Sequence, residues 1–217
     1  MITRQMGLAV NGTSKFDHNY FMEITTKKYQ LIYADPPWHF RVWSERGKAR
    51  SPDNHYPTRS LDYLRKLNIP GNAEINSVLL LWATFPCLRQ AFELAASWGF
   101  TYKTVAFTWV KTNKNNGRPF MGMGYYTRAN AELVLLFTRG KPLPRQSRNV
   151  PQVLLSPIAR HSEKPDVIRD RIVELFGDVS RIELFARDRQ DHTDAERFAG
   201  GDVFGNEAAN SIILPGR

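Results

Sequence analysis

The chain has 217 residues, of which 42% are hydrophobic, and this size suits one globular domain with a single sizeable core. The 30 lysine and arginine residues outnumber the 21 acidic residues, and the net charge of +9 favours a polyanionic partner over general solubility. No apolar stretch reaches the ~18 residues that a membrane span needs, so we expect neither a spanning helix nor a membrane partner.

Residues 1–27 are polar and irregular, and we expect an N-terminal arm or lead-in before a single domain at residues 28–217. The start of the chain lacks the long apolar stretch of a signal peptide. The single cysteine, Cys87, cannot form an internal disulfide, which fits a reducing compartment. We therefore expect a cytoplasmic protein.

Strands and helices are expected to alternate along the domain. Short runs rich in apolar, β-branched or aromatic residues predict strands at residues 30–34, 78–83, 104–110, 131–138, 153–155 and 182–185. Apolar residues at helical spacing predict helices at residues 60–67, 86–98 and 165–176. This alternation favours an α/β fold with a mostly parallel sheet.

Two long polar segments, residues 39–58 and 112–129, are expected to be loops that bind a partner. Residues 111–128 contain basic residues and no acidic one: Lys111, Lys114, Arg118 and Arg128. Residues 139–148 share this property: Arg139, Lys141, Arg145 and Arg148. This clustering favours nucleic acid as the polyanionic partner.

The tetrapeptide Asp35-Pro36-Pro37-Trp38 directly follows the first predicted strand. Open α/β sheets bind ligands at the carboxyl ends of their strands. Two prolines fix φ and make the turn stiff, and the turn carries a carboxylate, an aromatic plane and two carbonyl groups expected to be free. These groups suit a flat ring that bears an amino group. A surface turn is the alternative, which the rarity of the tetrapeptide disfavours.

Six further motifs follow in the chain. They are LNIP (67–70), LWAT (81–84), WVKTN (109–113), HSEKPD (161–166), ELFAR (183–187) and GNE (205–207). With the tetrapeptide, and over residues 28–207, this ordered set resembles the MT-A70 family of S-adenosylmethionine-dependent adenine N6-methyltransferases. The resemblance implies a Rossmann-like methyltransferase fold with helices on both faces of the sheet. It also implies a permuted motif order, because the tetrapeptide precedes the cofactor-binding strand.

Methyl transfer to an adenine amino group needs orientation and electron donation rather than a metal or a covalent enzyme intermediate. Asp35 and the Pro36 carbonyl can accept hydrogen bonds from the amino protons and align the nitrogen for in-line attack. Pro37 stiffens the turn, and Trp38 can stack on the base or wall its pocket, with a core tryptophan as the alternative. The histidines lack metal-ligand spacing, so we expect no metal.

The resemblance also implies which residues bind S-adenosylmethionine: Asp35, Lys164, Phe185, Arg187, Asn206 and Glu207. Lys164 is expected to meet the carboxylate of the cofactor and Phe185 to line its ribose. An amide and a carboxylate, as at positions 206 and 207, suit ribose hydroxyls. The chain departs from the family pattern in a longer charged insert at residues 188–205.

A base inside a duplex cannot reach such a pocket, so base flipping or a single-stranded substrate is implied. Substrate-binding candidates lie in or beside the polar loops: Tyr56, Lys111, Asn113, Arg118, Tyr125, Tyr126, Arg128 and Glu132. Ordinary loop packing is the alternative for each tyrosine, and an ion pair with a lysine or arginine is the alternative for Glu132.

These observations predict a DNA adenine N6-methyltransferase. The compact chain resembles the short bacterial and phage members of the family, which favours DNA. The same chemistry on RNA is the second hypothesis. A non-catalytic nucleic-acid-binding subunit is the third, and the intact tetrapeptide disfavours it. An enzyme of this size is expected either to form a homodimer or to accept loosely defined sequence contexts.

Overall fold

The structure, a computed structural model, describes residues 26–39, 58–159, 163–186, 201–205, 211, 212 and 214. The expected N-terminal arm and most of the expected loop at residues 39–58 lie outside these residues, and so do Tyr56, Arg187, Asn206 and Glu207. The helices are α2 (Leu61–Arg65), α3 (Ile69–Asn72), α4 (Leu88–Ser97) and α5 (Val167–Phe176), with a 3-10 turn at Phe85–Cys87. No helix in the described ranges is long and apolar enough to cross a bilayer.

A seven-stranded sheet in the order β5-β3-β4-β2-β1-β6-β7 forms the middle of the domain. Its strands are β1 (Tyr29–Ala34), β2 (Ala73–Ala83), β3 (Thr101–Thr112), β4 (Ala131–Arg139), β5 (Val153–Pro157), β6 (Arg181–Leu184) and β7 (Asp202–Phe204). Strand β4 is antiparallel to both neighbours, β2 and β3, while every other pairing is parallel. The expected mostly parallel sheet is confirmed, with one strand reversed.

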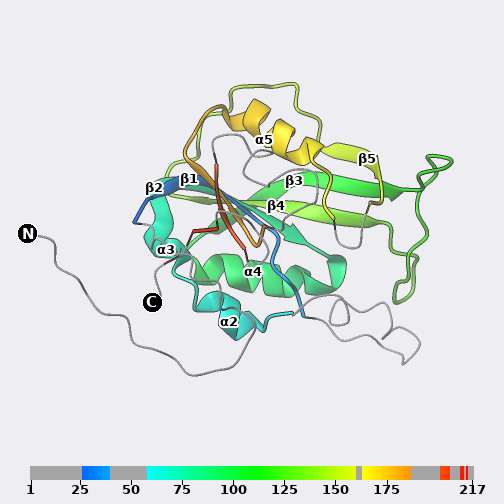
Figure 1. The fold of residues 1–217 in the computed structure, drawn as a ribbon, viewed down its shortest axis with the longest axis horizontal. Coiled ribbons are helices and arrows are strands. Elements are labelled where there is room, and N and C mark those ends of the chain that lie inside the picture. Colours follow the sequence, from blue (N-terminus) through cyan, green and yellow to red (C-terminus); the bar gives the residue numbers. More distant parts are fainter. Residues whose placement is uncertain are drawn as a thin grey trace, which may run out of the picture.

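Helices cover both faces of the sheet, as expected (Figure 1). Along β2, Val78, Leu80 and Trp82 pack in one buried cluster with α5, and the alternate residues pack in another cluster with α4. Because successive side chains of a strand point to opposite faces, a central strand covered on both sides must be apolar throughout. Residues 78–83 of β2 meet this requirement and are all buried.

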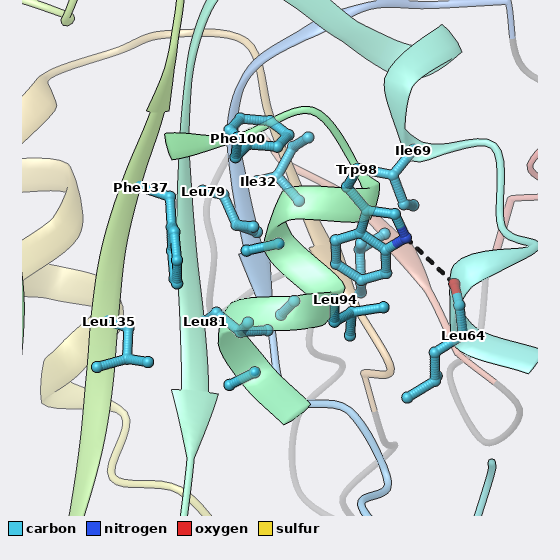
Figure 2. Packing of buried hydrophobic residues seen from close by; sticks show 14 of the residues in the cluster. Ile32, Leu64, Ile69, Leu79, Leu81, Leu94, Trp98, Phe100, Leu135 and Phe137 are labelled. Atoms are coloured by element: carbon cyan, nitrogen blue, oxygen red, sulfur yellow. Dashed lines mark hydrogen bonds between the residues drawn. The ribbon is translucent and has the colours of Figure 1, made fainter. Parts of the chain in front are cut away.

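Capping residues fix where the helices begin and end. The Ser60 side chain accepts a hydrogen bond from the Tyr63 N–H and caps α2, as its position before the apolar residues predicts. Helix α5 ends at Gly177, whose φ of 73° suits glycine. Trp98, which follows α4, donates from Nε1 to the Leu64 carbonyl at 3.1 Å and joins α4 to α2 (Figure 2).

Three features of the fold differ from the elements that the sequence predicts. Helix α3 and strand β7 are too short, at four and three residues, to show a hydrophobic period. Strand β2 begins at Ala73 rather than at residue 78, through a stretch that contains polar Glu74 and Asn76. Pairing with neighbouring strands, rather than the local pattern, forms β7 and places the start of β2 at Ala73, opposite Tyr29.

Candidate active site

One edge of the sheet gathers side chains from distant parts of the sequence. Strands β1 and β3 end at this edge, which brings Asp35 and Lys111 to it. Strand β4 runs in the opposite direction, so it begins there, and Glu132 is its second residue. Lys164 reaches the same edge from the segment that leads into α5. The reversed strand β4 therefore adds Glu132 to Asp35, Lys111 and Lys164 at this edge.

These four residues form a continuous charged cluster. Lys164 Nζ lies 2.9 Å from Asp35 Oδ2 and 3.3 Å from Glu132 Oε2. Lys111 Nζ lies 2.5 Å from Glu132 Oε1. The side chains of Lys164 and Glu132 are each only 11% exposed, whereas that of Asp35 is 25% exposed. Positive and negative charges alternate along the cluster, and its two ends, Asp35 at 25% and Lys111 at 24% exposed, are more open than its middle.

Glu132 is ionised within this cluster. Burial opposes the charged form, but the ammonium groups of Lys164 and Lys111 outweigh it and hold the pKa of the Glu132 carboxyl below its usual range. The ion pair with a lysine, which the sequence left as the alternative for Glu132, is what the structure contains. The partner lysines themselves belong to the candidate site, so the pairing does not remove Glu132 from it.

Two tryptophans lie beneath the two lysines. Lys164 Nζ is 5.3 Å from the centroid of the Trp82 ring, and Lys111 Nζ is 5.0 Å from that of Trp109. The two indoles meet edge to face, with centroids 6.2 Å apart. An ammonium group over an indole face gains a cation–π attraction, which is larger where water is excluded. The tryptophans thus form an aromatic floor for the charged cluster.

The carbonyl groups of the tetrapeptide are not free, contrary to the expectation. The Pro36 carbonyl accepts the Trp38 N–H at 2.8 Å, and the Pro37 carbonyl accepts the Arg59 N–H at 3.0 Å. The turn is centred on Pro37, which directs the Trp38 N–H back to the Pro36 carbonyl. A carbonyl oxygen has two acceptor sites, so Pro36 retains the capacity for one more hydrogen bond.

Trp38 is a buried core residue, which is the alternative that the sequence left open. It is 6% exposed and belongs to the cluster that packs against α4. Its Nε1 donates to the Trp82 carbonyl at 3.0 Å. Trp38 therefore anchors the turn to the neighbouring strand β2.

Phe185 follows β6 with a backbone that side chains rarely adopt. Its φ is 67°, and it is the only described residue other than glycine with a positive φ. Such strain is concentrated at functional sites, where the surrounding structure maintains it. The neighbouring β7 does so here, since the Phe204 carbonyl accepts the N–H groups of Phe185 and Ala186. A Cβ at Gly205 would lie 2.0 Å from the Ala186 carbonyl, so this close approach requires glycine.

The loop between β3 and β4 has an ordered base and an exposed tip. Asn113 donates to the carbonyls of Arg118 and Pro119, and Arg128 donates to those of Met121 and Gly122. These two substrate-binding candidates therefore hold the loop together. The other candidates face solvent: Arg118, Tyr125 and Tyr126, of which the last is 92% exposed.

The two basic segments lie at opposite ends of the sheet. Residues 113–130 extend from the edge that holds Asp35, and Figure 1 shows this green loop projecting beyond the strands. Residues 139–148 begin where β4 ends, at the opposite edge, and pass over the end of α5. Only the first segment is beside the candidate site, so the second contributes to net charge without bordering Asp35.

Sequence reasoning missed three residues of this region: Tyr33, Trp82 and Trp109. Their apolar settings in predicted strands indicated only core residues. The signal for two of them was their presence in the motifs LWAT and WVKTN, the second of which also contains the candidates Lys111 and Asn113. In the part of the chain that the structure describes, no group of three or more histidine, cysteine, aspartate or glutamate side chains could hold a metal ion.

The chain is similar to known methyltransferases over most of its length. A model of the MT-A70 family matches residues 29–196. The Type II methyltransferase M.MunI of a Mycoplasma species is 37% identical over 212 residues, which cover 90% of this chain and 84% of that protein. The human N(6)-adenosine-methyltransferase catalytic subunit METTL3 and the zebrafish METTL3 subunit are each 28% identical over 165 residues. These residues are 74% of this chain but only 26% of either METTL3 protein.

Proposed function

The chain belongs to the MT-A70 family and is an S-adenosylmethionine-dependent methyltransferase, and we propose that it methylates the N6 amino group of adenine in DNA. The observation that carries the proposal is the pairing of Asp35 with Lys164 at 2.9 Å beside the stiff Pro36-Pro37 turn. A carboxylate accepts hydrogen bonds from amino groups, and an ammonium group binds carboxylates. One pair can therefore serve both the adenine and the amino-acid end of the cofactor.

The charged edge of the sheet fits the cofactor. We assign Lys164 to the carboxylate of S-adenosylmethionine and one acceptor position of Asp35 to its amino group. Phe185, at the strained turn after β6, is assigned to the ribose. The family resemblance adds Arg187, Asn206 and Glu207 around the ribose. When bound, the cofactor supplies a methyl group on a positively charged sulfur.

Asp35 and Pro36 would activate the adenine. The amino nitrogen is a poor nucleophile because its lone pair is delocalised into the ring. Hydrogen bonds from its two protons to the Asp35 carboxylate and to the remaining acceptor site of the Pro36 carbonyl favour a tetrahedral nitrogen. Pro37 keeps these two acceptors at a fixed separation, so the nitrogen can be held in line with the methyl group.

Glu132 and Lys111 would keep Lys164 in position. Glu132 bridges the two lysines at 3.3 and 2.5 Å, so the Lys164 ammonium lies between two carboxylates. Burying an ammonium group is costly unless it is paired, and this arrangement supplies the pairing. The catalytic carboxylate Asp35 is thereby linked through Lys164 to a rigid part of the sheet.

Two observations support DNA as the substrate. The chain covers 84% of the length of the Type II methyltransferase M.MunI, but only about a quarter of the length of METTL3. The exposed residues Lys114, Arg118, Tyr125 and Tyr126 lie on the loop beside the site. Cationic side chains can contact phosphates, and a tyrosine can stack on an unpaired base after the adenine leaves the duplex.

Adenosine in RNA is the second candidate substrate, since the METTL3 relatives are named N(6)-adenosine-methyltransferases. Transfer of labelled methyl groups to matched duplex DNA, single-stranded DNA and RNA separates the two. Transfer to DNA in preference to RNA is expected, and transfer to RNA alone would overturn the DNA proposal. If the purified chain binds no cofactor, alone or with DNA, a non-catalytic binding subunit is the better description.

The proposal also covers the domain limits and the oligomeric state of the chain. We assign residues 28–217 to one methyltransferase domain and residues 1–27 to an arm that leads into it. We also propose that the enzyme forms a homodimer. Sedimentation equilibrium with and without substrate DNA tests that expectation, and a monomer in both conditions would contradict it.

A further inference from the structure

Trp82 connects the two halves of the candidate site. Its backbone carbonyl accepts the Trp38 indole N–H at 3.0 Å, and its own ring lies 5.3 Å beneath the Lys164 ammonium. Its side chain is 1% exposed, so it has little freedom to move by itself. A shift of this indole would disturb the lysine assigned to the cofactor, and a shift of the Trp82 backbone would disturb the tetrapeptide.

The Tyr33 hydroxyl fixes the Trp82 ring. The Trp82 Nε1–H donates to the Tyr33 hydroxyl oxygen at 2.6 Å. Tyr33 is paired in register with Leu80, two residues before Trp82, so both side chains point to the α5 face of the sheet. Burial raises the pKa of Tyr33, so its hydroxyl stays protonated and neutral at physiological pH.

A buried ion pair also packs against Tyr33. The Arg169 guanidinium lies 5.7 Å from the Tyr33 ring centroid. Arg169 also donates two hydrogen bonds to Glu183, from Nε at 2.7 Å and from Nη2 at 2.5 Å. A bidentate pair of this kind is rigid in direction as well as strong. Tyr33 thus contacts the ion pair through its ring and Trp82 through its hydroxyl.

We propose that Tyr33 is a positioning residue, which acts through Trp82 to hold Lys164 where it can bind the carboxylate of S-adenosylmethionine. This inference rests on the proposed role of Lys164. Tyr33 belongs to none of the motifs, and its hydrogen-bond contact with the site is through Trp82. Its effect should therefore appear in cofactor affinity, whereas the chemical step at saturating cofactor should change little.

The test compares two tyrosines of the same strand. Tyr33→Phe removes the acceptor for Trp82, and Tyr29→Phe is the matched control. Tyr29 is equally buried, and its hydroxyl donates to Asp202 at 2.8 Å from the opposite end of β1. Cofactor dissociation constants by calorimetry, kcat and KM for cofactor, and thermal midpoints are measured for wild type and both variants.

We expect Tyr33→Phe to raise the cofactor dissociation constant and KM about five- to twentyfold, with kcat changed less than about threefold. Tyr29→Phe should bind cofactor as wild type does, whatever its thermal midpoint. Trp82→Phe keeps a ring but lacks the indole N–H, so Tyr33→Phe should add little to its effect. If the wild type binds no cofactor, the proposed function fails.

Three results would overturn the role of Tyr33 while the proposed function stands. Cofactor affinity could be unchanged in Tyr33→Phe, it could fall equally in Tyr29→Phe, or the effects of Tyr33→Phe and Trp82→Phe could add in full. If Tyr33→Phe melts below the assay temperature, the same comparison is made at a lower temperature at which all variants are folded.

Discussion

Lys164 Nζ lies 2.9 Å from Asp35 Oδ2, which joins the turn after β1 to the segment that leads into α5. The two residues are far apart in sequence and belong to different motifs. Their contact makes the proposed adenine-facing carboxylate and the proposed cofactor-facing ammonium a single unit. The charge of either one affects the other, and variants of each should show distinct kinetic defects.

Asp35→Asn should lower methyl transfer at saturating cofactor by at least about a hundredfold, because a neutral amide is a weaker acceptor for the adenine amino protons. The thermal midpoint should stay within a few degrees of wild type. Asp62→Asn, on the exposed side of α2, is the control and should be fully active. Steady-state kinetics with labelled cofactor measure the effect, and wild-type turnover in Asp35→Asn would refute the role of Asp35.

Lys164→Met should weaken cofactor binding about ten- to hundredfold, because the carboxylate of the cofactor loses a partly buried partner. Lys164→Arg should recover part of the loss, since the charge is kept but the geometry differs. Calorimetric titration with S-adenosylmethionine checks both variants. Lys66→Met, at an exposed position, controls for loss of a lysine, and equal affinities in Lys66→Met and Lys164→Met would contradict the assignment.

Glu132→Gln should lower the free energy of unfolding by about 2–4 kcal/mol at neutral pH, because two lysines lose their shared carboxylate. The folded-state pKa of Glu132 is depressed, so its ionised form stabilises the native state above its unfolded pKa of about 4.3. This contribution is lost as the pH falls through the folded-state value.

Denaturant titrations across this acid range therefore check the direction in which the Glu132 contribution to stability changes with pH. The difference in unfolding free energy between wild type and Glu132→Gln should shrink as the pH falls. A difference that grows in acid would mean that the Glu132 carboxylate does not stabilise the fold. Glu174→Gln, at an exposed position on α5, serves as the control and should show little pH dependence of its own.

Charge reversal in the β3–β4 loop should weaken DNA binding in a salt-dependent way. The double variant Lys114→Glu and Arg118→Glu should lose about tenfold or more in affinity at low salt, with a smaller slope of log affinity against log salt. Lys141→Glu with Arg145→Glu changes the net charge equally at the opposite end of the sheet. If both pairs weaken binding to the same extent, net charge rather than the loop determines affinity.

The sequence predicted the alternation of elements and the position of the tetrapeptide, because both depend on local patterns. Apolar runs identify central strands, and Ser60 and Gly177 mark helix ends without reference to tertiary structure. The resemblance to a family also selected Lys164 and Glu132. Neither pattern nor motif showed that these two residues form one ion-pair cluster with Asp35.

What the sequence could not predict depends on strand pairing. The reversal of β4 brings Glu132 to the edge that holds Lys111, and no local feature of residues 131–138 encodes that direction. The carbonyls of Pro36 and Pro37 looked free because their donors, Trp38 and Arg59, are identified only by the folded path of the chain. Tyr33 looked like a core tyrosine because its hydrogen bond with Trp82 is likewise set by the fold and not by the local sequence.

The hairpin formed by β3 and β4 has a consequence for variation and engineering. Lys111 and Glu132 are bonded to each other at its base, so the charged cluster is closed before the chain enters residues 113–130. A loop that leaves and returns at a closed base can be lengthened, shortened or exchanged at small entropic cost. Exchanging this loop between such enzymes should therefore change substrate preference while the charged cluster stays intact.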